Sequence, residues 1–300
     1  MTRTRRPRGL RALLGMALLL LPAACTGASA GGDAASASPT MQAGRADIGG
    51  YSLDYQCLGT GSPTIILEAG YDSAGTSSFG GVWQQLAQVS RVCTYDRAGT
   101  GTSDPRPSAA ARDLTSEDEA QELHTLLDAA DIAPPYVVVA HSYGGFIGRL
   151  FTATYPDEVQ GLVLIESSHE DEIGPYRRYY GNDPAGNWVD GGDPIDIGAT
   201  AQLLRTTARD LGSIPLVVIR AQYYDDVLSP ALWRRTQADL ATLSTDGIEV
   251  EALGSHHFVQ NDDPGVVVAA VRATVAAARA GAPLAPCPEV VAGVRARCLT

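Results

Sequence analysis

The stretch Pro135–Phe146 reads PYVVVAHSYGGF, an apolar β-branched run that leads into a serine flanked by small residues. Such a run favours a strand, and the residues after the glycine pair favour a helix. A serine between a strand and a helix, with small residues two positions before and after it, indicates a nucleophile elbow. Ala140 stands where the usual G-x-S-x-G pattern has its first glycine. Ser142 is therefore the candidate nucleophile.

The chain around this elbow alternates predicted strands and helices, which is typical of an open parallel sheet with helices on both faces. Continuous apolar runs such as Leu162–Ile165 indicate strands buried on both faces. Eight strands are expected, at residues 45–48, 51–58, 64–68, 91–95, 136–140, 161–165, 215–220 and 248–252. Helices are expected at residues 81–89, 115–130, 145–155, 230–243 and 264–280.

A long insertion, residues 167–212, separates the sixth and seventh strands. It is rich in Gly, Asp, Pro and Tyr, with one helical stretch near residues 200–210. Insertions at the carboxyl end of a sheet usually cover the site, so a short lid is predicted, with a plain surface excursion as the alternative. Its aromatic residues either bind an apolar acyl or aryl group or pack the lid on the body: Tyr176, Tyr179, Tyr180 and Trp188.

The N-terminal residues form a predicted targeting segment. Arginines precede the apolar run Leu10–Leu21, which is too short to span a bilayer, and small residues follow to Ala30. Ala28–Ala30 fits ordinary secretion, whereas Leu21–Cys25 resembles a bacterial lipobox. We expect residues 1–30 to be the signal or lipobox region. Residues 31–45, rich in Ala, Gly and Ser at their start, are expected to be a flexible linker.

The five cysteines favour the lipobox interpretation. Four of them lie in the mature region, where an exported protein could join them in two disulfides. Cys25 is then the cysteine left without a disulfide partner, and lipidation would account for its presence. The protein is expected to be exported, either anchored to a membrane through a lipidated Cys25 or secreted.

Charge argues against nucleic acid as a partner. Five of the 22 basic residues and none of the 34 acids precede Cys25, so the remainder carries 17 arginines against 34 acids. A surface this acidic repels phosphate backbones and is most simply explained by solubility.

Four motifs in order resemble those of the α/β-hydrolase superfamily over residues 46–280. Leu67–Tyr71 resembles its oxyanion loop, Tyr95–Asp104 its D-R-x-G-x-G-x-S loop, Ala140–Gly144 its elbow and Gly254–Phe258 its histidine loop. The resemblance implies a serine hydrolase of the exported bacterial esterase kind. It implies an α/β-hydrolase domain at residues 46–300 with a mostly parallel eight-stranded sheet, and it requires no cofactor or metal.

The resemblance also implies a Ser, acid, His order along the chain. His257 falls on the family's histidine and its neighbour His256 on a glycine. The acid has two possible positions. Glu166, directly after a buried apolar run, is favoured because similar family members carry an aspartate there. The alternatives, Asp226 and Asp225, follow the seventh strand.

The same resemblance implies that the backbone N–H groups of Tyr71 and Tyr143 form the oxyanion hole. In this superfamily the second strand pairs with the fourth, so a Cys57–Cys93 cross-strand disulfide is expected. A Cys287–Cys298 disulfide would close the tail at residues 281–300.

Cleavage of a small-molecule or lipid-like carboxylic ester through an acyl-enzyme is the favoured function. The alternatives are an amidase or proline-type aminopeptidase, a cofactor-free non-hydrolytic enzyme of this fold, and a non-catalytic binding protein. A serine at the elbow weighs against dehalogenases and epoxide hydrolases, which place an aspartate there. Gly99–Gly101 lacks the third glycine of a dinucleotide-binding loop.

Overall fold

The computed structural model describes residues 40–107, 114–180, 188–224 and 228–299. Within these ranges, a nine-stranded sheet runs in the order β1-β2-β4-β3-β5-β6-β9-β10-β11. The strands from β4 to β10 in this order are parallel, and β1, β2 and β11 pair antiparallel at the two edges. Their bounds are β1 Met41–Asp47, β2 Ser52–Leu58, β3 Thr64–Glu68, β4 Val92–Tyr95, β5 Tyr136–His141, β6 Val159–Ile165, β9 Leu216–Ala221, β10 Gly247–Ala252 and β11 Ala296–Cys298. The predicted α/β-hydrolase architecture is confirmed.

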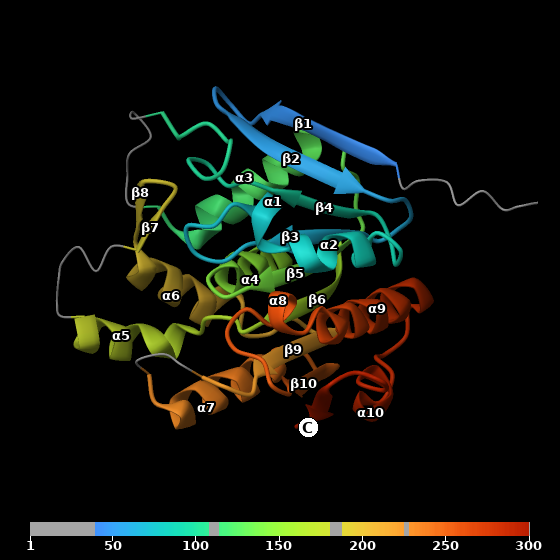
Figure 1. The fold of residues 1–300 in the computed structure, drawn as a ribbon. Coiled ribbons are helices and arrows are strands. Elements are labelled where there is room, and N and C mark those ends of the chain that lie inside the picture. Colours follow the sequence, from blue (N-terminus) through green and yellow to red (C-terminus); the bar gives the residue numbers. More distant parts are fainter. Residues whose placement is uncertain (1–39, 108–113, 181–187, 225–227, 300) are drawn as a thin grey trace, which may run out of the picture. The chain divides into compact units, whose positions relative to one another are not determined.

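Helices cover both faces of this sheet (Figure 1). One face carries α3 (Ser116–Ala129), α4 (Gly144–Thr154) and α7 (Pro230–Ala241), and α6 (Ile197–Thr207) packs on α3 and α4. The other face carries α2 (Gly80–Leu86), α8 (Val259–Asp262) and α9 (Pro264–Ala280). The shorter elements are α1 Gly75–Ser78, η2 Glu170–Glu172, α5 Ile173–Tyr180, β7 Trp188–Asp190, β8 Asp193–Ile195 and α10 Cys287–Val290.

The central strands are apolar throughout because both of their faces are buried. In β5, Val138 and Ala140 face the core beneath α3 and α4, whereas Val137 and Val139 face the core beneath α2 and α9. Successive side chains of a strand point to opposite faces, so a strand buried on one face only would have alternating apolar and polar residues. Each fully buried valine contributes about 1.5–3 kcal/mol.

The sheet is larger than the sequence predicts. β1 begins at Met41, because all seven of its residues pair with β2, so residues 41–45 belong to the sheet and not to the expected linker. The ninth strand, β11, pairs with β10 and covers an edge that would otherwise be open. A separate hairpin, β7–β8, lies in the predicted lid. Strands of three residues are too short to show a hydrophobic period.

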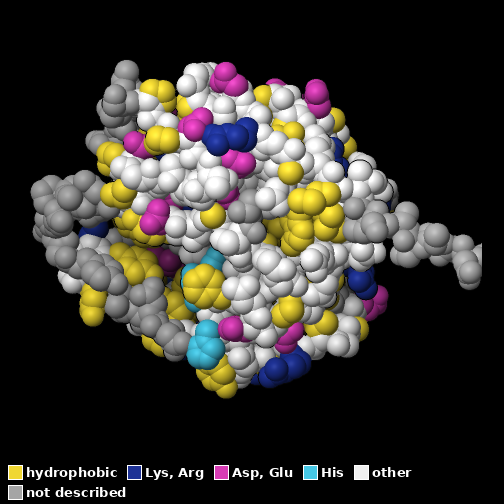
Figure 2. Space-filling view, turned by 45° about the horizontal axis from the view of Figure 1, so that its top comes forward, with side chains coloured by type: hydrophobic (Ala, Val, Ile, Leu, Met, Phe, Trp, Pro, Cys, Tyr) yellow, Lys and Arg dark blue, Asp and Glu magenta, His cyan; other side chains and the backbone are white. Residues whose placement is uncertain are grey.

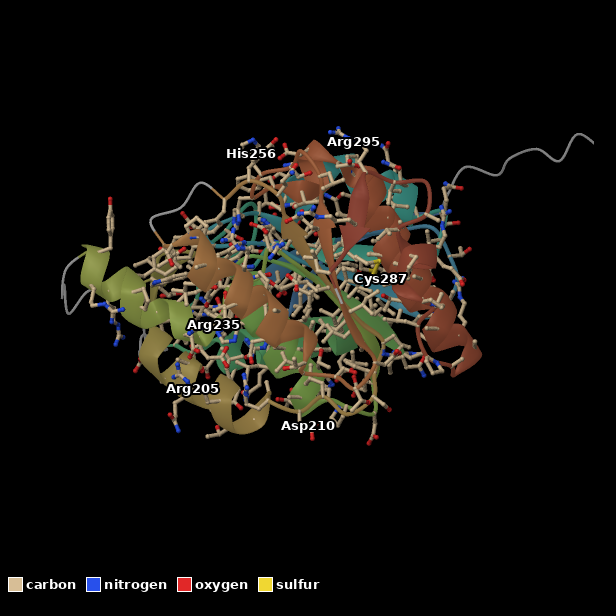
Figure 3. The ribbon with its side chains drawn as sticks, turned by 90° about the horizontal axis from the view of Figure 1, so that it is seen from below. Arg205, Asp210, Arg235, His256, Cys287 and Arg295 are labelled. Atoms are coloured by element: carbon tan, nitrogen blue, oxygen red, sulfur yellow. A yellow bond between two sulfur atoms is a disulfide. The ribbon has the colours of Figure 1, made fainter. Side chains whose placement is uncertain are left out.

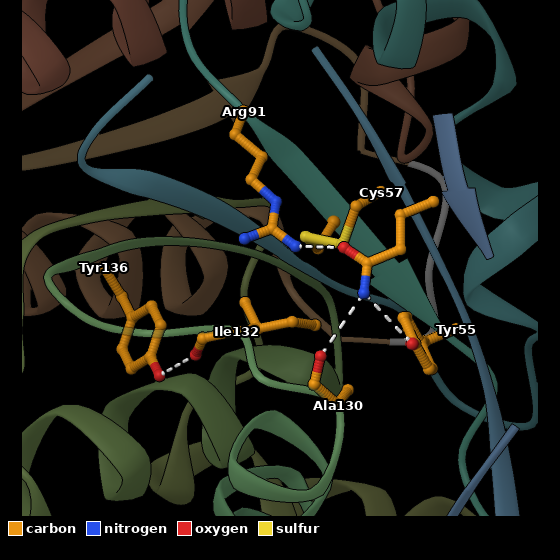
Figure 4. The surroundings of a disulfide bond; sticks show 8 residues. Tyr55, Cys57, Arg91, Ala130, Ile132 and Tyr136 are labelled. Carbon is orange, nitrogen blue, oxygen red and sulfur yellow. Dashed lines mark hydrogen bonds between the residues drawn. A yellow bond between two sulfur atoms is a disulfide. The ribbon is translucent and has the colours of Figure 1, made fainter. Parts of the chain in front are cut away.

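The structure contains both predicted disulfides. Cys57 and Cys93 lie opposite each other in the β2–β4 register, with Cα atoms 4.0 Å apart. Gln42 pairs with Cys57 across β1 and β2, and its side chain hydrogen-bonds Arg91, Tyr55 and the Ala130 carbonyl, which Figure 4 labels around this bond. The second disulfide, Cys287–Cys298, joins α10 to β11. It therefore ties the last strand to the body of the domain.

Residues 1–39, which include the predicted targeting segment and Cys25, lie outside the described residues. In the part of the chain that is described, no helix combines the length and apolarity needed to cross a membrane. The described residues, from Thr40 to Leu299, belong to one compact unit.

Removing the Cys57–Cys93 bond should lower the free energy of unfolding by about 2–4 kcal/mol, because the unfolded chain regains the entropy of the closed loop. The double variant Cys57→Ala/Cys93→Ala, compared with the wild type in urea denaturation, measures this loss. Alkylation of Cys57 in folded, unreduced protein would contradict the pairing.

Candidate active site

Ser142 lies on a tight turn between β5 and α4. Its φ is 54°, in the left-handed region, and its N–H donates to the Ile165 carbonyl at 3.0 Å. A Cβ on Gly144 would lie 2.4 Å from the Ala69 carbonyl oxygen, and one on Gly145 would lie 1.8 Å from Ser167 Oγ. Only glycine therefore allows α4 to start this close to the ends of β3 and β6.

Ala140 fits the first position of the elbow because the residue opposite it on α4 is a glycine, which has no side chain. A Cβ on Gly148 of α4 would lie 2.9 Å from the Ala140 Cβ. Gly148, one helical turn after the elbow, therefore leaves room for the methyl group that Ala140 has in place of the usual glycine.

Three predicted residues meet at the carboxyl edge of the sheet. His257, in the loop between β10 and α8, has its Nε2 3.0 Å from Ser142 Oγ. Its Nδ1 is 3.4 Å from Glu166 Oε2. A carboxylate only accepts hydrogen bonds, so Nδ1 carries the proton and Nε2 is free to accept the serine proton.

Glu166 follows β6 directly and is buried, with 1% of its surface exposed. Its φ of 47° turns the chain out of the strand. Its other oxygen, Oε1, accepts the Ala221 N–H at 2.6 Å. Burial raises the pKa of Glu166, whereas its bonds to His257 and Ala221 oppose that rise by favouring the carboxylate.

The other histidines near the site have different surroundings. His141 Nε2–H donates to the His257 carbonyl at 2.9 Å, and burial lowers the pKa of His141 to about 3. His141 is therefore neutral at physiological pH and supports the His257 loop without adding charge. The backbone N–H of His256 donates to Asp262, and its ring packs against Tyr223. The structure places His257, not His256, at Ser142.

The predicted oxyanion donors border the same space. The Tyr143 amide follows Ser142 directly, and a Cβ on Gly70, next to Tyr71, would lie 3.4 Å from the Ser142 Cβ. Among the described residues, neither the Tyr71 nor the Tyr143 backbone N–H has a hydrogen-bond acceptor. Both remain available for a ligand. The alternative acids Asp225 and Asp226 lie outside the described residues.

The described part of the predicted lid packs beside the site. Its helical stretch is α6, at residues 197–207 and not 200–210, and η2, α5 and the β7–β8 hairpin are additional elements. The centroid of the Trp188 ring lies 5.3 Å from the centroid of the Tyr71 ring and 5.6 Å from that of the Tyr143 ring. Trp188 thus packs on the body, as one of the two interpretations of the lid aromatics predicts, and the substrate-binding interpretation stays a prediction.

The start of this insertion is anchored by charge. Buried Glu170 accepts from Arg149 Nη1 at 2.8 Å. Next to it, exposed Asp171 lies 3.1 Å from Arg205 of α6 and 3.7 Å from Arg235 of α7, and Figure 3 labels these two arginines on their helices. These pairs hold η2 between the two helices.

The sequence did not indicate a buried ionic network under the site. Arg97, in the loop after β4, lies among Glu68, Glu119 and Asp190 and is 2% exposed. The only signal was the charged pair Asp96–Arg97 at the start of a loop made mostly of small residues. Among the described residues, no cluster of histidine, cysteine or acidic side chains could hold a metal ion.

Comparison with known proteins shows the family of this chain. The α/β-hydrolase fold model matches residues 63–187. The uncharacterized protein YqjL of Bacillus subtilis is 30% identical over 222 residues, which cover 71% of this chain and 83% of that protein. The chain belongs to the α/β-hydrolase family.

Solved α/β-hydrolase structures support the fold. The haloalkane dehalogenase DbeA from Bradyrhizobium elkani superposes with a TM-score of 0.61 at 16% identity, over 81% of this chain and 100% of that one. Est816, an N-acyl homoserine lactone degrading enzyme, has a TM-score of 0.56 at 17% identity, over 76% and 99%. At these identities the likeness extends to the fold alone.

Replacing Glu170 with Gln should destabilise this α/β-hydrolase by about 3 kcal/mol at neutral pH. Burial alone would raise the pKa of Glu170, but Arg149 holds it at about 2. A carboxyl whose folded pKa is depressed stabilises the protein above its unfolded pKa and stops doing so as the pH falls through its folded pKa. The difference between wild type and variant, measured by urea denaturation, should therefore shrink as the pH falls below about 4.5.

Asp171→Asn is the matched control, because that neighbouring acid is exposed and its ion pairs contribute little. A Glu170→Gln variant as stable as Asp171→Asn at neutral pH would show that the Arg149 pair does not stabilise the fold.

Proposed function

We propose that this α/β-hydrolase cleaves carboxylic esters through an acyl-enzyme. The observation that carries the proposal is the chain of contacts from Ser142 Oγ through His257 to buried Glu166, at 3.0 and 3.4 Å. This arrangement activates a serine hydroxyl, which is a weak nucleophile until a base takes its proton.

The proposed reaction has two halves. His257 Nε2 takes the Ser142 proton while Oγ bonds to the ester carbonyl carbon, and the resulting oxyanion lies at the Tyr71 and Tyr143 N–H groups. The carbon–oxygen bond to the alcohol then breaks, and His257 returns the proton to the leaving oxygen. Water, deprotonated by His257, attacks the acyl-serine in the same way and releases the acid and free Ser142.

Apolar side chains around Ser142 support an ester with a hydrophobic group. Phe258, next to His257, is 52% exposed, and Tyr71 is 41% exposed. Figure 2 shows histidine side chains next to hydrophobic ones on one face of the molecule. Exposed aromatic groups of this size at the site's rim favour an apolar acyl or aryl part of the substrate.

The charges near the site weigh against an aminopeptidase. The acids beneath the loop that follows β3 are Glu68, Glu119 and Asp190, and each lies within 4 Å of Arg97 and is fully buried. Carboxylates occupied in this way do not offer a site for a substrate amine. The alignment of Ser142, His257 and Glu166 also weighs against a non-catalytic binding protein.

The mature domain should hydrolyse p-nitrophenyl esters, and Ser142→Ala should lose this activity while keeping its circular dichroism spectrum. A series of acyl chain lengths would give the size of the acyl pocket. If well-folded wild-type protein hydrolyses none of these esters, the proposed function is wrong.

Glu166→Gln should lower kcat by about 10³–10⁴-fold, because a neutral amide no longer stabilises the imidazolium of His257. His256→Gln is the matched control, since that adjacent ring packs away from Ser142 and its loss should change kcat little. A full loss in Asp226→Asn, with activity kept in Glu166→Gln, would assign the acid to Asp226 instead.

Export remains part of the proposal. Two disulfides in the mature region support an oxidising compartment, and Cys25 supplies the thiol for a lipid. Palmitate labelling of cells that express the full chain should mark the wild type and not Cys25→Ala. Labelling that survives this substitution would contradict lipidation at Cys25, and unlabelled wild-type protein in the medium would indicate secretion.

A further inference from the structure

The guanidinium of Arg97 uses all five of its N–H donors beneath the loop that follows β3. Nε and Nη2 bind the two oxygens of Asp190 at 2.7 and 2.8 Å, and Nη1 binds Glu68 at 2.7 Å. The two remaining donors reach backbone carbonyls, Ala69 at 2.9 Å and Gly70 at 2.7 Å. A fully paired guanidinium cannot rotate without breaking several charge-assisted hydrogen bonds.

The Gly70 carbonyl matters because it shares a peptide plane with the Tyr71 N–H. In a trans peptide the C=O and N–H groups point in opposite directions. The bond from Arg97 Nη2 to the Gly70 carbonyl therefore directs the Tyr71 N–H away from Arg97. The neighbouring Gly70 Cα lies against Ser142, since a Cβ there would approach the Ser142 Cβ to 3.4 Å.

The next peptide is held from the same network. The Asp72 N–H donates to Asp190 Oδ1 at 2.8 Å, the same oxygen that binds Arg97 Nη2. Asp72 has a φ of 46°, so the chain turns there instead of continuing outward. The Tyr71 amide is thus fixed on both sides by one buried ion pair.

We infer that Arg97, held by Asp190, is a positioning residue that orients and polarises the Tyr71 N–H as an oxyanion donor. A cation on the carbonyl of an amide draws electron density from that amide and strengthens its N–H as a donor. Because Arg97 is rigid before substrate arrives, the donor needs no reorganisation when negative charge develops on the substrate. This inference rests on the proposed function.

Arg97→Lys tests this role, because lysine keeps the charge but cannot bind Asp190, Glu68 and the Gly70 carbonyl in one plane. For ester hydrolysis, kcat should fall by about 10–100-fold, a share of the cost of losing one oxyanion donor, while KM changes little. Labelling of Ser142 by a fluorophosphonate should slow by a similar factor, since Oγ bonds to phosphorus, fluoride leaves and the phosphoryl oxygen occupies the same site.

Arg106→Lys is the matched control. Arg106 is also buried and lies 3.9 Å from Glu119. Its hydrogen bonds go to Glu122 and Asp193, and among the described residues it makes none to the loop at residues 69–72. Its replacement should cost comparable stability in urea denaturation and leave kcat and the labelling rate within about threefold of wild type.

Each outcome decides the inference. The inference is wrong if folded Arg97→Lys protein reacts with the fluorophosphonate at the wild-type rate. It is also wrong if Arg106→Lys slows this labelling as much as Arg97→Lys does. If Arg97→Lys does not fold, Asp190→Asn should slow labelling in the same direction, and an unchanged rate there would also overturn it. Wild-type protein that labels but hydrolyses no ester would contradict only the proposed function, whereas wild-type protein that does not label would contradict both.

Discussion

The turn at Ser142 requires two backbone segments to approach with no side chain between them, and the rest of the site depends on that approach. Gly144 and Gly145 let the start of α4 lie against the ends of β3 and β6, where a Cβ would come within 2.4 Å of Ala69 or 1.8 Å of Ser167. The same closeness brings the loop after β3 and the carboxylate after β6 to the serine. A larger residue at the elbow would therefore displace the oxyanion loop and the acid together.

Buried charge surrounds this turn on both sides, but the two groups differ in how they are neutralised. Arg97 lies within 4 Å of three acidic side chains, and its five donors are all occupied, so its guanidinium is held in one orientation. Glu166 is equally buried, yet its partner is the imidazole of His257, whose side chain is 44% exposed. A guanidinium whose donors are all paired keeps its surroundings rigid. A carboxylate next to a half-exposed imidazole can instead stabilise the positive charge that the imidazole acquires when it takes a proton.

Local sequence predicted most of this architecture, and pairing between distant residues accounts for what it missed. The central strands appear as apolar runs, and the positions of Ser142 and His257 follow from motifs of a few residues. The three-residue strands have no such signal, and β11 is held by its pairing with β10 and by a disulfide to α10. Likewise, Asp190 lies 93 residues from Arg97 in the chain, in a segment whose composition indicated only a lid.

The contact between Glu166 and His257 stabilises one charge state of the imidazole much more than the other. At 3.4 Å it is longer than a typical charge-assisted hydrogen bond, and a neutral imidazole gains little from it. Once His257 accepts the serine proton, the same separation joins a half-exposed cation to a buried anion, and their attraction is stronger than it would be in water. Glu166 would thus contribute mainly when His257 becomes positively charged on the way to the transition state. An interaction of this kind lowers the reaction barrier because it does not stabilise the resting enzyme equally.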